Sequence, residues 1–460
     1  MKKITIEIIQ ITCYICMGLQ IGLGFLWAVA NWGKVPGFEE SRELLFMAET
    51  LQPDDYTGLL YPVCIKGSHL LEGWTGLPSC GFVYGLQLVV AYFSYQYFLR
   101  WIVSPKPEKR MHLQKRMPVY VGFLITIPVV LQVHMAVLPY SLASSFFVVL
   151  LARVLQVCLA ESAVKKKDFY GIVVFWILSA QFCPDYFWLS TVAVGIGAVW
   201  YIGKHKEAVR KWILLMVLMI ACMVGLNSFW QTPGSTGKME RTFGGIMLTR
   251  FVWPNFNELS FFWDKEVKES FTVEELSVLS TYPEKVFTDF GPVIEQKYGK
   301  KRAGEIYWNM VKISLKMDTK DVLYPVIEDG AAYLCPPLSV YLQLRGMGTS
   351  YTGWNYGRMK DYTPLITKYY VEISLKLWIY LLIAGTLLLL LNIFSRVWCP
   401  AKEKARIRSI VGYCILNGLV VNGWYVMVSG NMQDYKKVLM ITILWGFLII
   451  AVLRRPLGIK

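Results

Sequence analysis

Long apolar stretches, separated by short polar connections, make up most of the chain. Most are close to the roughly 20 residues that a helix needs to cross a bilayer, although 169–183 is short for a crossing. The pattern predicts an all-α polytopic membrane protein with about ten transmembrane helices. The stretches lie at 4–30, 81–103, 117–138, 141–160, 169–183, 186–203, 212–230, 369–395, 409–429 and 438–453.

Two longer polar segments interrupt this pattern, at 31–80 and 231–368. The second follows the seventh apolar stretch and is long enough to form a small domain. Its apolar residues recur at helical spacing, and Thr272 followed by Glu274 and Glu275 is typical of a helix start, so we expect a mostly helical exterior domain. The predicted parts are an N-terminal membrane module at 1–230, the exterior domain at 231–368 and a C-terminal membrane module at 369–460.

The composition agrees with a membrane protein and disfavours a cytosolic enzyme. Only 17% of the residues are charged, 55% are hydrophobic and the mean hydropathy is +0.42, whereas a soluble domain is nearer a quarter charged. The net charge of +15 at first suggests nucleic acid. The basic residues are concentrated in short connections between apolar stretches, however, so we expect no nucleic-acid partner.

The distribution of basic residues also predicts the orientation. The connections on one side carry 22 Lys and Arg residues, and the short loops on the other side carry five. Because basic loops stay in the cytoplasm, we expect both termini there and the segments 31–80 and 231–368 outside. The abundance of lysine and the lack of a targeting peptide favour the bacterial cytoplasmic membrane, with a eukaryotic endomembrane as the alternative.

The segment 31–80 is the strongly acidic part of the chain, with a net charge of −4. Glu39 and Glu40 follow the first apolar stretch and are expected near the lipid headgroups. A carboxylate at that depth can take a proton from an attacking hydroxyl group. The alternative is that both glutamates stabilise the N-terminus of the following helix.

At this point the residues resemble a known family. The run Glu39-Glu40-Ser41-Arg42-Glu43, then Asp54-Asp55-Tyr56, then Leu60-Tyr61-Pro62 is similar to the opening of polyprenyl-phosphate-sugar glycosyltransferases of the GT-C superfamily. The nearest branches are the protein O-mannosyltransferase-like and aminoarabinose-transferase-like families. The resemblance covers about 230 residues of the membrane part, by the order of its elements, and its motifs are short.

This resemblance implies roles for single residues. Glu39 would be the general base, with Glu40 as the second choice. The run from Gln132 to Met135, with Leu138-Pro139-Tyr140 after it, resembles the family's second exterior loop, although the acid usual near Tyr140 or Ser141 is missing. Asp185 stands where the family has an acid between spans five and six. The candidate substrate-binding residues are Asp54, Asp55, Tyr61, Lys66, His134, Asp185 and Arg250.

Some of these residues also have plain structural interpretations. A lone histidine such as His134 at a helix end is more often a hydrogen-bonded structural residue than a catalyst. Lys66 and Arg250 are candidates because a leaving phosphate needs cations. Arg153 lies inside the fourth apolar stretch, where a charge either serves function or reaches back to the cytoplasmic end. Cys64 and Cys80 share the first exterior segment and can form a disulfide if their geometry allows it.

The sequence thus predicts an integral-membrane glycosyltransferase. It would move a sugar from a polyprenyl-phosphate carrier to an exterior envelope acceptor (lipid, polymer or protein) by an inverting displacement. Its partners would be membrane lipids, the lipid-linked sugar and that acceptor. No metal-ligand motif is present, no cofactor beyond the donor is implied, and the need for a divalent metal stays open.

Two other functions remain as alternatives. A transporter or lipid flippase would show paired charges in the spans, broken helices and internal symmetry. A non-catalytic envelope assembly protein would also tolerate the acidic segment.

Overall fold

The structure, a computed structural model, is built of helices, and no strand occurs among the residues that it describes. These residues are 2–34, 41, 44–45, 48–49, 51, 60–103, 117–160, 166–183, 185–204, 209–230, 247–253, 256, 263–281, 289–317, 319–320, 322–324, 326–327, 364–394, 401–428 and 435–453. The prediction of an all-α chain is confirmed for this part of the protein.

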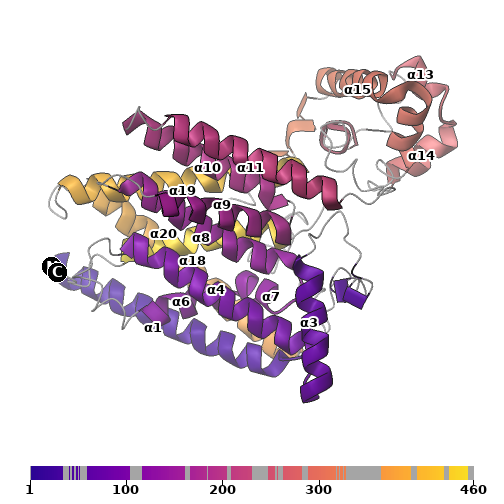
Figure 1. Cartoon of the computed structure of the whole chain (residues 1–460). Helices are drawn as coiled ribbons and strands as arrows, with labels where there is room; N and C mark the ends of the chain where they lie inside the picture. The colour runs from indigo at the N-terminus through magenta and orange to yellow at the C-terminus, as the bar shows by residue number, and fades with distance from the viewer. Residues whose placement is uncertain are drawn as a thin grey trace.

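The helices form two groups with separate hydrophobic cores. The larger group is a bundle, and the smaller one lies beyond the end of the bundle, on the side of α3 (Figure 1). The bundle contains α1 (Lys2–Asn31), α3 (Leu60–Thr75), α4 (Ser79–Val103), α6 (Met117–Ile125), α7 (Pro128–His134), α8 (Pro139–Leu159), α9 (Lys166–Phe182), α10 (Asp185–Lys204), α11 (Val209–Trp230), α18 (Pro364–Phe394), α19 (Ala401–Val428) and α20 (Tyr435–Leu453). The smaller group contains η4 (Leu248–Val252), α13 (Lys265–Lys268), α14 (Val273–Thr281) and α15 (Gly291–Met317).

Helix α8 lies at the centre of the bundle and packs on α4, α9 and α10. In the most apolar 18-residue stretch of α8, 78% of the residues are buried, against 33% in α1 and 44% in α10. A helix that is apolar all round belongs in the interior, whereas a helix with one exposed apolar face needs an apolar surrounding. On α1 that exposed face is formed by Ile8, Ile11, Ile15, Leu19, Phe25, Leu26 and Val29. We therefore expect lipid against α1.

Three described helical segments are long and apolar enough to cross a membrane: Ile11–Asn31, Pro139–Leu159 and Asp185–Gly203. A fourth crossing arises if α6 and α7, which meet at an angle of 81°, count as one broken span. The membrane class is confirmed at this level, while the total of about ten spans stays a prediction.

The apolar stretch 117–138, expected as one span, is interrupted between α6 and α7. Pro128 begins α7, and Ile127 before it is extended (φ −61°, ψ 128°). Proline lacks the amide hydrogen that would continue a helix, and its ring disfavours a helical residue before it. The stretch therefore changes direction inside the bundle.

The disulfide considered for Cys64 and Cys80 does not form, because both thiols are free. The guanidinium of Arg153 lies 5.1 Å from the centre of the Tyr97 ring and donates to the side chain of Gln156 at 3.4 Å. A cation over an aromatic face is stabilised without a carboxylate partner. This placement favours a structural role for Arg153.

The smaller group folds around an aromatic core that includes Trp253, Phe256 and Phe290. Helix α14 begins where the sequence predicts it, after Thr272. The Thr272 hydroxyl accepts a hydrogen bond from the Glu275 amide (3.2 Å), and the Glu275 carboxylate accepts one from the Thr272 amide (2.7 Å). This reciprocal pair is a capping box, so the predicted helix start is confirmed.

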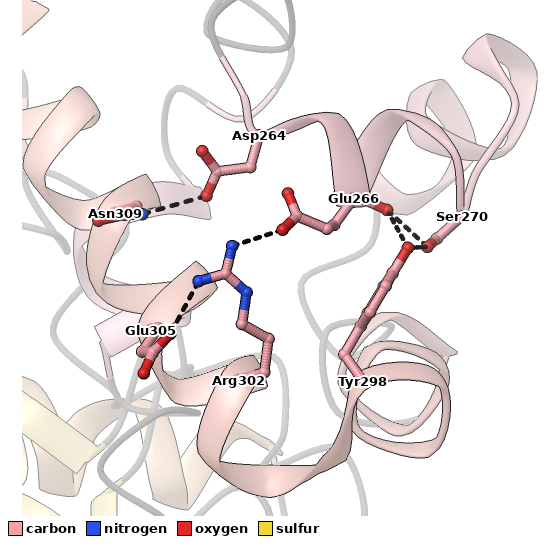
Figure 2. A network of polar contacts seen from close by, with 7 residues as sticks. All are labelled: Asp264, Glu266, Ser270, Tyr298, Arg302, Glu305 and Asn309. Atoms are coloured by element: carbon pink, nitrogen blue, oxygen red, sulfur yellow. Dashed lines mark hydrogen bonds and ion pairs between the residues drawn. The ribbon is translucent and has the colours of Figure 1, made fainter.

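A polar network joins α13 to α15 on the surface of the smaller group (Figure 2). Arg302 donates to Glu266 across the two helices and to Glu305 at 2.7 Å on its own helix. Asn309 donates to Asp264 at 3.3 Å. The hydrogen bond from Arg302 holds the pKa of Glu266 below its ordinary value of 4.5.

This lowered pKa predicts a pH effect on the contact between α13 and α15. Because Glu266 binds its proton less readily in the folded protein, its stabilising contribution is present above pH 4.5 and is lost as the pH falls through its lowered pKa. Replacing Arg302 (Arg302→Met) should raise the pKa of Glu266 toward the ordinary value. Carbon-13 NMR titration of the side-chain carboxyl groups measures this, with Glu266→Gln to assign the signal. Lys265→Met, which removes a weaker influence, should shift the pKa less, and equal shifts in both variants would contradict the assignment.

Candidate functional site

The candidate site lies at the end of the bundle where α1 ends and α3 runs across the neighbouring helices (Figure 1). Tyr61, in the first turn of α3, is fully buried there. Its hydroxyl donates a hydrogen bond to the side-chain oxygen of Gln87 on α4 (2.8 Å). Its ring packs edge-on against Phe182 at the end of α9, with 6.5 Å between the ring centres. Tyr61 therefore ties α3 to two helices of the bundle.

Gln87 links Tyr61 to the end of the broken helix α7. Its amide nitrogen donates to the backbone carbonyl groups of His134 and Ala136, both at 2.8 Å. The last carbonyl groups of a helix have no partner within that helix. The buried Gln87 side chain supplies such partners for α7 and uses both its donors and its acceptor.

His134 is fully buried in the same network. One ring nitrogen, Nε2, lies 2.9 Å from the Tyr95 hydroxyl, and the other, Nδ1, lies 2.6 Å from the Ser141 hydroxyl. Two hydroxyl partners hold the ring in one orientation, and the described contacts of the ring include no carboxylate. This geometry favours the structural interpretation of His134, as a hydrogen-bonded residue at the end of a helix.

Asp185 lies in the first turn of α10, where the helix dipole favours a negative charge. Tyr140, in the first turn of α8, donates a long hydrogen bond of 3.4 Å to its carboxylate. The sequence has no acid near Tyr140 in the connection that the resemblance identifies as a second exterior loop. The fold brings an acid there from α10. The contact between Asp185 and Tyr140 could not be read from the sequence, because the two residues are 45 positions apart.

Lys66 and Arg250 lie away from this network. Lys66 is exposed on α3, on a different face from the buried Tyr61 and Ile65. Arg250 lies in η4 of the smaller group, with only 3% of its surface exposed. Their proposed contact with a phosphate stays a prediction.

The four acidic candidates Glu39, Glu40, Asp54 and Asp55 lie outside the described residues. The described residues before and after the glutamate pair are attached to the bundle. The carbonyl group of Lys34 accepts a hydrogen bond of 2.7 Å from Tyr84 on α4. Ser41, Leu44 and Ala48 are buried, and the last two belong to the core of the bundle. The chain after α1 therefore returns to the same bundle.

The network around His134 is completed by three residues that the sequence did not single out: Gln87, Tyr95 and Ser141. A signal was present for Gln87, because a glutamine inside an apolar stretch of a membrane protein needs a buried partner. Ser141 gave a weaker signal, since serine is common in helix–helix contacts. In the part of the chain that the structure describes, no group of three or more His, Cys, Asp or Glu residues could hold a metal ion.

We compared the chain with known protein families, curated proteins and solved structures. No family model, curated protein or solved structure matches the chain.

Proposed function

We propose that the protein is an integral-membrane glycosyltransferase that moves a sugar from a polyprenyl-phosphate carrier to an exterior envelope acceptor. The observation that supports this proposal is the meeting of candidate residues from distant elements at one end of the bundle. Tyr61 reaches this end through its hydrogen bond to Gln87, and Asp185 contacts the first turn of α8. The anchors Lys34 and Ser41 attach the segment with the two glutamates to the same bundle.

In the proposed reaction, a hydroxyl oxygen of the acceptor forms a bond with the sugar's anomeric carbon while the bond from that carbon to the phosphate oxygen breaks. The phosphate leaves with the bonding electron pair and needs no proton. The acceptor proton passes to a carboxylate, Glu39 as first choice and Glu40 as second. A single displacement inverts the configuration at the anomeric carbon.

The remaining residues would position the substrates. Asp185 and the hydroxyl of Tyr140 offer polar contacts to a sugar at the helix ends. Lys66 is exposed on α3, where a cation can meet a lipid phosphate. The protein would work in the bacterial cytoplasmic membrane with both termini in the cytoplasm.

The purified protein, reconstituted in vesicles, tests this function. A panel of radiolabelled polyprenyl-phosphate sugars is added together with an envelope extract that supplies acceptors. We expect label to leave at least one carrier, faster than in protein-free vesicles, and to appear on the acceptor with inverted configuration. Label that stays on every carrier in the panel contradicts the proposal.

A second function, transport or flipping of a lipid, is favoured by the 81° break between α6 and α7. Discontinuous helices line the substrate sites of many transporters. The same vesicles separate the two functions. A transporter moves the intact carrier from one leaflet to the other, whereas a glycosyltransferase cleaves the bond between sugar and phosphate.

A further inference from the structure

The break between α6 and α7 lies deep inside the bundle. Thr126, at the break, contacts Gln20 of α1, which lies near the middle of the candidate span Ile11–Asn31. A hydrocarbon surrounding offers no hydrogen bonds, so interrupted helices are tolerated in membranes only where protein or water satisfies their polar groups. The surroundings of Thr126 therefore show how this break is stabilised.

Two helices clamp the break through the Thr126 carbonyl group. It accepts one hydrogen bond from the side-chain nitrogen of Gln20 (3.1 Å) and another from the hydroxyl of Tyr370 on α18 (2.6 Å). Gly24 allows α1 to come close, because a Cβ atom there would lie 2.6 Å from the Cβ atom of Thr126. Direct protein contacts thus satisfy this carbonyl.

The groups beside this clamp are not satisfied in the same way. The side-chain oxygen of Gln20, the hydroxyl of Ser374 and the indole nitrogen of Trp378 are buried and have no hydrogen-bond partner among the described residues. Tyr370, Ser374 and Trp378 follow one another at intervals of four residues on α18, so they share one helix face. The ring of Trp378 stacks on Phe123 of α6 at 5.9 Å. The three groups therefore lie beside the break.

A fourth such group comes from α20, which also packs beside the break. The Thr442 hydroxyl is buried and has no hydrogen-bond partner in the described part of the chain. Thr442 precedes Gly446 by one helical turn. A Cβ atom at Gly446 would lie 3.4 Å from the side chain of Ile127 and 3.7 Å from Trp378. Helix α20 thus packs beside the break and carries an unsatisfied polar group one helical turn away from this contact.

The chemistry of these groups fits water. Gln20 offers an acceptor, Trp378 offers a donor, and the hydroxyls of Ser374 and Thr442 can do both. Buried polar groups in proteins are nearly always hydrogen-bonded, to protein or to ordered water, and a buried water makes two to four such bonds. All four groups are neutral, which suits water better than an ion, whose charge they would not balance.

We propose that the break between α6 and α7 is a hydrated site near the middle of the membrane, where bound water joins α1, α18 and α20. The proposed glycosyl transfer takes place at the exterior end of the bundle and does not need this site. The proposal therefore stands whether or not the transferase function holds.

X-ray radiolysis of the wild-type protein in lipid bilayers tests the proposal without any substitution. Hydroxyl radicals formed from bound water oxidise the side chains next to it, and mass spectrometry measures the oxidation of each tryptophan. Trp176 is the matched control, because it is equally buried but its indole nitrogen donates to Thr191 at 3.0 Å. We expect Trp378 to be oxidised several-fold faster than Trp176. Equal rates overturn the proposal.

A second arm uses a small methanethiosulfonate reagent on the variant Ser374→Cys. Such reagents react with the thiolate, which forms readily only in a hydrated surrounding. The internal control is the native Cys414, a buried thiol near the middle of α19. We expect the new thiol to react at least about tenfold faster than Cys414. A rate no faster than that of Cys414 contradicts a hydrated site.

Discussion

Replacing Glu39 with glutamine (Glu39→Gln) is expected to lower the rate of sugar release from the polyprenyl-phosphate carrier by at least about a hundredfold, because general-base catalysis contributes about 10²–10⁴-fold. Glutamine keeps the size of the side chain and its ability to accept a hydrogen bond, but it cannot take up the acceptor's proton. The release of radiolabelled sugar in reconstituted vesicles measures the effect. The binding of the carrier should change little, since the reacting proton belongs to the acceptor.

Two further substitutions make this result specific. Glu40→Gln should have the smaller effect if Glu39 is the base, and the larger one if the order of the two residues is reversed. Glu49→Gln is the matched control, because Glu49 is an exposed glutamate of the same segment, and its activity should stay close to that of the wild type. If release is unchanged in both Glu39→Gln and Glu40→Gln, the two glutamates serve to stabilise a helix N-terminus instead.

Replacing Gln87 with leucine (Gln87→Leu) is expected to destabilise the bundle strongly. The variant leaves the proton of the Tyr61 hydroxyl and the carbonyl groups of His134 and Ala136 without the partner that they share. An unsatisfied buried polar group costs about 1–3 kcal/mol, so the free energy of unfolding should fall by about 3 kcal/mol or more. This is a large share of the roughly 5–15 kcal/mol that stabilise a typical protein.

Thermal unfolding in detergent measures this loss, followed with a dye that fluoresces on reaction with the buried free cysteines. The melting temperature should fall by at least about 5 °C. Gln132→Leu is the matched control, because Gln132 is also buried, but its side-chain nitrogen has no hydrogen-bond partner among the described residues. That variant should lose less stability than Gln87→Leu. Equal losses in both variants would show that the hydrogen bonds of Gln87 are not the cause.

The sequence predicted those features of the fold that depend on neighbouring residues. The apolar stretches gave the helical class, and Thr272 with Glu275 gave the start of α14. The break at Thr126 was not predicted, because the stretch around it is apolar throughout and only Pro128 indicates a change of direction. Its clamp joins Thr126 to residues 106 and 244 positions away, and such distant pairs leave no periodic pattern.

The candidate site was predicted in part for the same reason. Tyr61 and Asp185 were named from short motifs, and the fold places both at one end of the bundle. Gln87 was missed because its role depends on the carbonyl groups of His134 and Ala136, at and just after the end of α7, which are 47 and 49 positions away. A sequence gives the type of a polar residue inside an apolar stretch, but its partner is set by helix packing.

The clamp on Thr126 also has a consequence for the synthesis of the protein. Gln20 precedes Thr126 in the chain, but Tyr370 is synthesised 244 residues after it. At about 5–20 residues per second, the nascent N-terminal module waits roughly 10–50 s for its second donor. During that time the break is held from one side only. An insertase or a quality-control protease of the membrane would therefore act on a growing chain in which the Thr126 carbonyl group has its hydrogen bond from Gln20 but not yet the one from Tyr370.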